Sequence, residues 1–174
     1  MPAPERTSLE AIVAAASDIL EASGLDAVTM QAVAARVGVK APSLYKRVAD
    51  REALVRLVAD TATERLATAL ERPTTLAEAA RAFRAFAREH PRSFQLIFSA
   101  SADPEILARA SAPVLRIARD LAGEGDALNA ARLLTAWAVG FVQMELAGAF
   151  QLGGELDEAF EYGLRGVERA ITPR

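Results

Sequence analysis

Residues 33–48 read VAARVGVKAPSLYKRV, and this stretch has the pattern of two short helices joined by a tight turn. Ala34 is small enough for two helices to cross closely, and Gly38 permits a sharp turn between them. Apolar side chains at helical spacing would join both helices into one small core: Val33, Val37, Val39, Leu44 and Val48. The pattern predicts a helix-turn-helix, a motif that places its second helix in the major groove of DNA.

The distribution of charge supports the same interpretation. The whole chain is slightly acidic, with a formal net charge of −3, which by itself argues against a nucleic-acid partner. The window 36–51, however, contains a single acid, Asp50, and both lysines of the chain. Its basic residues are Arg36, Lys40, Lys46, Arg47 and Arg51. A concentrated basic patch matters more than total charge for binding a phosphate backbone, so we expect this window, Lys40 included, to contact DNA.

The composition excludes several classes of site. The chain has 174 residues, 52% of them apolar, which is ample for a buried core. It has no cysteine, so disulfides, thiolate nucleophiles and cysteine-ligated metals are excluded. A single histidine, His90, leaves little material for a metal site or a Ser–His triad. We therefore expect no cofactor, no metal site, no catalytic residues and no enzymatic activity.

No segment has the length of a membrane span. The longest run without a charged residue, 133–144, is much shorter than the roughly 20 residues that a helix needs to cross a bilayer. Charged side chains also interrupt residues 1–30, so no signal-peptide core is present there. We expect a cytoplasmic protein without a membrane partner.

Helical periodicity runs through the chain, and no stretch alternates like a strand. We expect an all-α fold of about nine helices: a three-helix helix-turn-helix domain followed by a helical ligand-binding and dimerisation domain. Thr29 and Asp50 are predicted to cap the second and fourth helices. Capping boxes are predicted for Thr7 with Glu10 at the first helix and for Thr75 with Glu78 at the fifth. The third helix is expected to carry Leu44 and Val48, and the last four to cover 92–100, 103–123, 126–150 and 155–171. The domains predicted are 1–50, for DNA binding, and 51–174, for regulation and dimerisation.

Residues 7–54 resemble the N-terminal DNA-binding domain of the tetracycline-repressor (TetR) family of bacterial transcription regulators. The resemblance rests on the order and spacing of Gly24-Leu25, Val28-Thr29-Met30, Val33-Ala34, Val37-Gly38-Val39, Pro42-Ser43-Leu44-Tyr45, Val48 and Arg51-Glu52-Ala53-Leu54. It implies a homodimer that binds double-stranded DNA at a palindromic operator and responds to a small-molecule effector.

The resemblance also implies roles for single residues. By position, Thr29 and Arg51 resemble the family's phosphate contacts at the starts of the second and fourth helices, and Gln31 stands where a base-reading side chain can occur. The implied recognition surface is Ala41, Pro42, Ser43, Tyr45, Lys46 and Arg47. Two interpretations of Tyr45 stay open, a phosphate contact through its hydroxyl or a half-buried helix aromatic. Arg36 is expected to be a solvated charge.

Residues 136–148 resemble a TetR-family C-terminal domain type marked by a Trp, then His-Gly, then a Leu-Glu pair. In this chain Val139 stands where that type has its histidine, so any polar role of that position is absent. The resemblance implies that the last two long helices pair with their symmetry mates in a four-helix interface.

Two sets of residues in the regulatory half carry further predictions. The expected dimer interface is Ala136, Gly140, Gln143, Ala147, Leu156, Phe160, Leu164 and Val167. The alternative is that these stripes fill the core of the subunit itself. The expected apolar effector pocket is Phe83, Phe86, Phe94, Gln95, Phe98, Trp137, Phe141 and Met144. The alternative for these aromatics is ordinary core packing.

The sequence thus predicts a sequence-specific DNA-binding transcriptional regulator, a repressor released from its operator by a small, largely apolar effector. A helical protein-interaction domain without DNA binding is one alternative, and the basic patch argues against it. A small-molecule enzyme is another, and the absence of any nucleophile or acid–base constellation argues against that.

Overall fold

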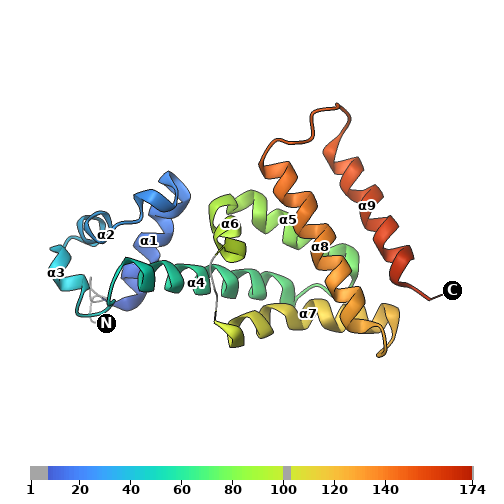
Figure 1. Cartoon of the computed structure of the whole chain (residues 1–174), viewed down its shortest axis with the longest axis horizontal. Helices are drawn as coiled ribbons and strands as arrows, with labels where there is room; N and C mark the ends of the chain where they lie inside the picture. The colour runs from blue at the N-terminus through green and yellow to red at the C-terminus, as the bar shows by residue number, and fades with distance from the viewer. Residues whose placement is uncertain (1–7, 100–102, 174) are drawn as a thin grey trace. The chain divides into compact units, whose positions relative to one another are not determined.

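The computed structural model describes residues 8–99 and 103–173, and within these ranges the chain forms nine α-helices, one 3-10 turn and no strand. The helices are α1 (Leu9–Ser23), α2 (Met30–Val37), α3 (Ala41–Leu44), α4 (Arg51–Glu71), α5 (Leu76–Glu89), α6 (Pro91–Ser99), α7 (Pro104–Ala122), α8 (Ala127–Leu146) and α9 (Leu156–Ile171), and the 3-10 turn η1 is Leu25–Ala27. The predicted all-α fold is confirmed (Figure 1).

The chain divides into two compact units, which we describe separately. The first comprises residues 1–63 and 90–104, and therefore contains α1, α2, α3, α6 and the first part of α4. The second comprises residues 64–89 and 105–174, with the end of α4 and helices α5, α7, α8 and α9. In the described part of the chain no helix has the length and apolar character that a bilayer crossing requires.

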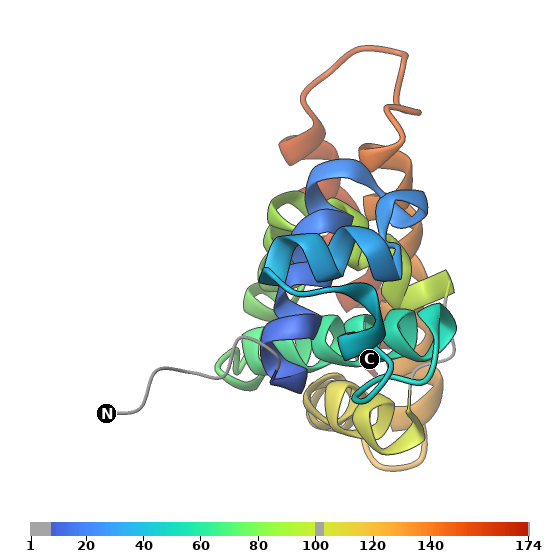
Figure 2. The same ribbon diagram turned by 90° about the vertical axis from the view of Figure 1, so that its left-hand side faces the viewer.

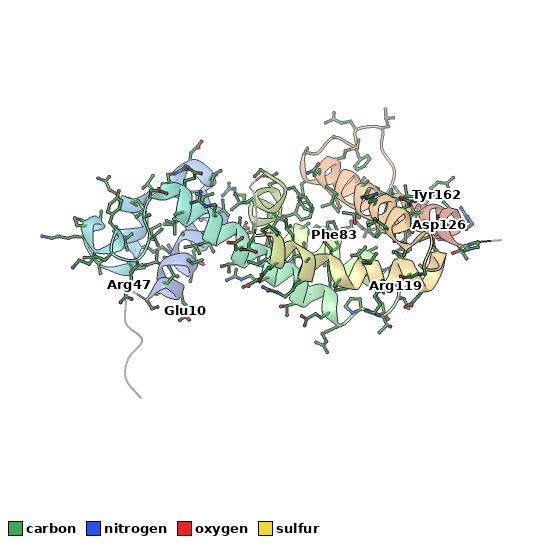
Figure 3. All side chains as sticks on the ribbon, turned by 60° about the horizontal axis from the view of Figure 1, so that its bottom comes forward. Glu10, Arg47, Phe83, Arg119, Asp126 and Tyr162 are labelled. Carbon is green, nitrogen blue, oxygen red and sulfur yellow. The ribbon has the colours of Figure 1, made fainter. Side chains whose placement is uncertain are left out.

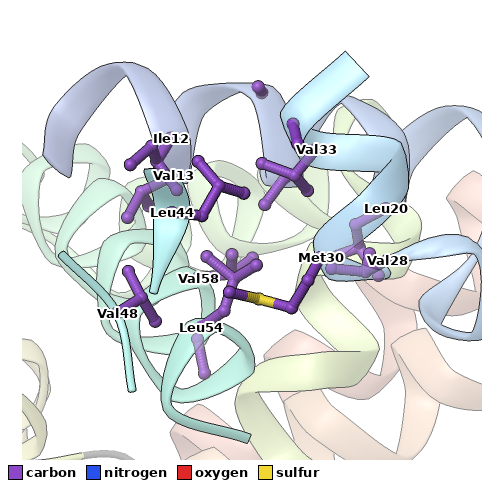
Figure 4. Close-up of a cluster of buried hydrophobic side chains, with 14 of the residues drawn as sticks. Ile12, Val13, Leu20, Val28, Met30, Val33, Leu44, Val48, Leu54 and Val58 are labelled. Carbon is purple, nitrogen blue, oxygen red and sulfur yellow. The ribbon is translucent and has the colours of Figure 1, made fainter. Parts of the chain in front are cut away.

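One apolar core holds the first unit together. The helix-turn-helix contributes Val33, Leu44 and Val48 to it, and all three are buried. They pack with α1 and α4 side chains that include Ile12 and Leu54 (Figure 4). Figure 2, which looks onto this unit, shows α1, α2 and α3 (blue to cyan) lying against one another. The predicted joining of the two motif helices through apolar side chains is confirmed.

Side-chain caps set the starts of three helices. Thr29 Oγ1 accepts the Ala32 amide hydrogen at 3.0 Å, and Asp50 Oδ1 accepts that of Ala53 at 2.7 Å. At α5 the Glu78 amide donates to Thr75 Oγ1 and the Thr75 amide donates to Glu78 Oε2, each at 3.2 Å, which is a capping box. These three predicted caps are confirmed. The first helix differs from its prediction, because Ser8 caps α1 by accepting the Ala11 amide hydrogen at 3.1 Å, while Thr7 lies outside the described residues.

Gly38 ends α2 in the left-handed region, with φ of 76°. Its amide donates to Ala35 at 3.2 Å and the Val39 amide donates to Ala34 at 2.9 Å, so the last carbonyls of α2 are satisfied within the turn. Most residues with a Cβ are strained at positive φ, which explains why a glycine stands between the two motif helices.

Two predicted helices are longer than those observed. The α3 helix ends at Leu44 and is followed by a turn, in which the Arg47 and Val48 amides both donate to the Leu44 carbonyl. The α8 helix ends at Leu146 rather than near residue 150, because Gly148 adopts φ of 62°. For α6, the predicted last residue, Ala100, lies outside the described residues.

Candidate nucleic-acid interface

The predicted DNA contacts lie in the first unit, at the start of α2, just before α3, within α3, in the turn after it and at the start of α4. Most of them are exposed, namely Thr29, Gln31, Lys40, Pro42, Tyr45, Lys46, Arg47 and Arg51. Ala41 and Ser43 are partly buried. The structure thus leaves the polar and charged side chains of the motif at the surface, while its valines and Leu44 form the core. Figure 3 shows Arg47 on the outside of this unit.

The start of α2 has the chemistry of a phosphate contact. Thr29 caps the helix through its hydroxyl oxygen, and a hydroxyl that accepts one hydrogen bond can still donate another. The first backbone amides of a helix point outward and carry partial positive charge. A phosphate oxygen beside Thr29 would meet both kinds of donor.

Tyr45 follows α3 directly, and it is 54% exposed. Leu44, its neighbour, is fully buried, so the backbone at this point is anchored while the phenol stays at the surface. At this exposure both interpretations, a phosphate contact and a half-buried helix aromatic, stay predictions. The exposure of Tyr45 fits a side chain that contacts a partner.

Two arginines of the basic window have partners inside the protein. Arg36 pairs with Asp18 of α1 at 2.9 Å, in an exposed ion pair between two helices. Arg51 donates from Nε to the Val28 carbonyl at 2.7 Å and from Nη2 to the Leu25 carbonyl at 2.8 Å. Sequence reasoning did not anticipate the second arrangement, since nothing in the motif pairs residue 51 with residues 25 and 28.

The comparisons with known proteins agree with this geometry. Residues 5–58 match the family described as bacterial regulatory proteins, tetR family, and residues 76–167 match the tetracyclin repressor-like C-terminal domain. An uncharacterised HTH-type transcriptional regulator of Mycobacterium tuberculosis, Rv0681, is 32% identical over 161 residues, which cover 83% of this chain and 73% of that protein. The chain belongs to the TetR family. It is therefore a DNA-binding transcriptional regulator.

Solved structures show the same fold. SCO4313 aligns with a TM-score of 0.79 and 24% identity, over 95% of this chain and 98% of that one. A variant of TetR from Acinetobacter baumannii AYE, crystallised in complex with minocycline, aligns with a TM-score of 0.71 and 21% identity, over 94% and 95% of the two chains. At these identities the alignments establish the TetR-family fold.

The residues predicted to line an effector pocket fall into both units of this TetR-family chain. Phe94, Gln95 and Phe98 lie in the first unit, where the Phe94 and Phe98 rings are 5.0 Å apart. The others lie in the second unit: Phe83, Phe86, Trp137, Phe141 and Met144. Phe83 and Phe86 are buried on α5, whereas Met144 is 46% exposed on α8.

A cluster of aromatic rings lies where α8 meets α9. The Phe160 ring is 5.2 Å from both Trp137 and Phe141, and Phe141 is 4.9 Å from Phe150. Trp137 and Phe141 thus pack on one another and on α9. The sequence placed these two residues together correctly, but their shared neighbour Phe160 was expected at a dimer interface.

An arginine that the sequence analysis did not single out lies beside these rings. Arg84 of α5 is buried and donates two hydrogen bonds to Glu145 of α8. Its guanidinium carbon lies 4.7 Å from the Phe160 ring centre, and its Nη2 is 2.7 Å from Asp157 of α9. The hydrogen bonds to Glu145 raise the pKa of Arg84. The two partners are 61 positions apart in the sequence, so no local pattern marks the pair.

The predicted interface residues of α9 and those of α8 lie in different environments. Phe160 is 1% exposed and Leu164 is 2% exposed, so both fill the core of the chain itself and have almost no surface for a second chain. Phe160 faces α8 and α5 in the same protein, through Trp137, Phe141 and Arg84. On α8, by contrast, Ala136, Gln143 and Ala147 are exposed.

Proposed function

We propose that this protein is a homodimeric repressor, which binds a palindromic operator and leaves it when a small, largely apolar effector binds. Its role is regulatory rather than catalytic, and it acts in the cytoplasm, where bacterial DNA is found. One observation carries the proposal: the helix-turn-helix buries its apolar residues and leaves Gln31, Tyr45, Lys46 and Arg47 exposed around the start of α2 and the end of α3.

For the DNA interface we propose that one set of residues contacts phosphates and another set contacts base edges. Thr29, Lys40, Tyr45, Lys46 and Arg47 would contact phosphates and fix the register of the protein on the duplex. The base-reading surface would be Gln31 with Ala41, Pro42 and Ser43. A glutamine can pair with adenine, and the apolar Ala41 and Pro42 suit a thymine methyl group. Residues 1–50 would carry this interface and residues 51–174 the regulatory and dimerising functions.

For dimerisation we propose the outward faces of α8 and α9. Along α8 the exposed or partly exposed residues at helical spacing are Leu133, Ala136, Gly140, Gln143, Met144 and Ala147. Along α9 they are Ala159, Tyr162, Gly166 and Ala170. Small side chains let helices approach closely, and two such faces related by a twofold axis would make a four-helix interface. Leu156 and Val167 are partly buried and would lie at its margin.

For the effector we propose an apolar site bordered by the aromatic residues of α5 and α8, with Phe83, Phe86, Trp137 and Phe141 as its candidates. Phe94, Gln95 and Phe98 of α6 lie in the first unit, and their role stays a prediction. An effector acts only through its different affinities for the operator-binding and released states.

DNA binding is tested first, by fluorescence anisotropy. Duplexes that the protein selects from a random library and duplexes from its own upstream region would be compared with scrambled DNA across a salt series. Selective binding that weakens with salt supports the proposal. Equal binding to all duplexes would overturn selective operator binding. No binding at low salt would overturn DNA binding altogether and favour the interaction-domain alternative.

Two double variants test whether selective DNA binding depends on the helix-turn-helix. Replacing Lys46 and Arg47 by alanine should abolish selective binding, because both side chains are exposed beside α3. Replacing Arg65 and Arg72, which are exposed on the second unit, removes the same charge and should leave selective binding intact. Equal effects from the two pairs would show that charge alone accounts for binding.

A further inference from the structure

The first residue of α4, Arg51, is bound to the turn that precedes α2. Its Nε donates to the Val28 carbonyl at 2.7 Å and its Nη2 donates to the Leu25 carbonyl at 2.8 Å. These two carbonyls stand at the two ends of one 3-10 turn, since the Val28 amide donates to the same Leu25 carbonyl at 3.1 Å. One planar guanidinium thus spans the whole turn with two nitrogens.

A basic residue at this position is unfavourable for α4 itself. The N-terminus of a helix carries partial positive charge and favours acids, and Asp50 and Glu52 on either side of Arg51 follow that rule. Arg51 opposes it. Hydrogen bonds from a charged donor to carbonyl oxygens are stronger than neutral ones, so the two bonds to the turn can offset this electrostatic cost.

The turn that Arg51 holds leads directly into the proposed DNA interface. Val28 is 1% exposed, and the next residue, Thr29, is the cap of α2. The position of Val28 therefore sets where the Thr29 hydroxyl and the first amides of α2 lie. Gln31 follows within the first turn of the same helix.

We propose that Arg51 is a positioning residue for DNA binding: it fixes the 25–28 turn so that Thr29 and Gln31 meet the duplex, rather than contributing its charge to a phosphate. The proposal rests on the proposed function, because it concerns how the α2 end of that interface is held.

The test compares wild type with Arg51→Ala and Arg51→Lys on a duplex selected by wild type and on scrambled DNA. We expect Arg51→Ala to weaken selective binding about tenfold, the size of a lost charged hydrogen bond. The slope of log affinity against log salt should stay unchanged, because Thr29 and Gln31 carry no charge. Binding to scrambled DNA should weaken less than selective binding, because it loses only the phosphate contact of Thr29 and not the base contact of Gln31. Arg51→Lys should not restore selective binding, because an ammonium keeps the charge but lacks the planar two-nitrogen fork.

Two control variants are measured beside Arg51→Ala and Arg51→Lys. Arg56→Ala removes a charge from the next turn of α4, where Arg56 pairs with Glu52, and it should leave selective binding unchanged. Lys46→Ala, a proposed phosphate contact, should lower the salt slope by about 0.9. Circular dichroism at the assay temperature establishes that each variant is folded.

Three results would overturn the inference. A salt slope lowered by about 0.9 in Arg51→Ala, with rescue by Arg51→Lys, would make Arg51 a phosphate contact. Lower thermal stability with unchanged selective binding would make its role structural only. Full selective binding and full stability in Arg51→Ala would show that the two bonds have no function. Failure of the proposed function is a separate result, in which wild type itself selects no sequence.

Discussion

The carboxylate of Glu145 accepts two hydrogen bonds from Arg84, each of 2.7 Å, and both side chains are about nine-tenths buried. The pair joins α5 to α8, and Arg84 reaches α9 as well, through Asp157. A buried charge is costly unless it is paired and hydrogen-bonded. Here each carboxylate oxygen of Glu145 accepts one hydrogen bond from Arg84. This contact fixes three helices of the regulatory unit relative to one another.

Removal of one partner from this pair should be strongly destabilising. We expect Glu145→Leu to lower the free energy of unfolding by about 3 kcal/mol, because Arg84 is left buried without its main partner. The double variant Arg84→Met, Glu145→Leu should recover most of that loss, since both charges are gone. Urea denaturation of the three proteins measures the effect. Equal losses in the single and double variants would contradict the interpretation of the pair as an electrostatic contact.

Gly163 of α9 provides a test of the aromatic cluster. A Cβ at this position would lie 2.8 Å from Nε1 of Trp137, so there is no room for it without movement of the indole. We expect Gly163→Ala to cost about 1–3 kcal/mol of stability and to shift the fluorescence of Trp137, the only tryptophan in the chain.

A double-mutant cycle separates this clash from a general effect on α9. In Trp137→Phe the ring atoms that would meet the new methyl group are absent. The loss caused by Gly163→Ala should therefore be smaller in that background. Strict additivity of the two substitutions would show that Gly163 does not matter for the position of the indole.

The helix-turn-helix was predictable because its information is local. Thr29, Gly38 and Asp50 act on amides and carbonyls within a few residues, and the spacing of Val33, Leu44 and Val48 follows from helical geometry. The predicted third and eighth helices were longer than the observed α3 and α8. An apolar Val48 looks helical by periodicity, yet it reaches the core from a turn that follows α3.

The regulatory half was less predictable because its contacts join distant residues. The α9 stripe that contains Phe160 and Leu164 was expected to be covered by a second chain, and periodicity alone does not tell which neighbour covers a stripe. The structure covers it with the same chain. Likewise, the contact between Arg84 and Glu145 and that between Arg51 and the 25–28 turn span long stretches of sequence, and no local pattern marks them.

The pair formed by Arg81 and Glu161 predicts a specific pH dependence. Hydrogen bonds from Arg81, at 2.7 and 2.8 Å, and its charge hold the pKa of Glu161 below the ordinary value of 4.5. A carboxyl whose pKa is lower in the folded protein stabilises it above the unfolded pKa, and this contribution is lost as pH falls through the folded pKa.

We therefore expect Glu161→Gln to be less stable than wild type near neutral pH and equally stable well below pH 4.5. Urea denaturation at a series of pH values measures the difference. Glu168→Gln, an exposed change on the same helix, should run parallel to wild type. A difference between wild type and Glu161→Gln that persists unchanged into acid would contradict an electrostatic origin.

The proposed dimer interface can be disrupted at Ala136, which is exposed on α8. An arginine there would place a charge in the centre of the proposed helix packing, so we expect Ala136→Arg to be a monomer with a nearly unchanged fold. Ala85→Arg, an exposed alanine on α5, should remain a dimer. Analytical ultracentrifugation gives the oligomeric state. A dimeric Ala136→Arg would place the interface on another surface.

Tyr45 and Tyr162 are the two tyrosines of the chain, and both phenols are exposed. If the Tyr45 hydroxyl donates to a phosphate, Tyr45→Phe should weaken binding by roughly ten- to a hundredfold, the size of one hydrogen bond to a charged group. The loss should be the same on selected and scrambled duplexes, because a phosphate contact carries no sequence information. Tyr162→Phe, on the outside of α9, should bind like wild type (Figure 3). A loss confined to the selected duplex would instead make Tyr45 a base-reading residue. No loss at all would contradict the phosphate contact and favour the half-buried helix aromatic.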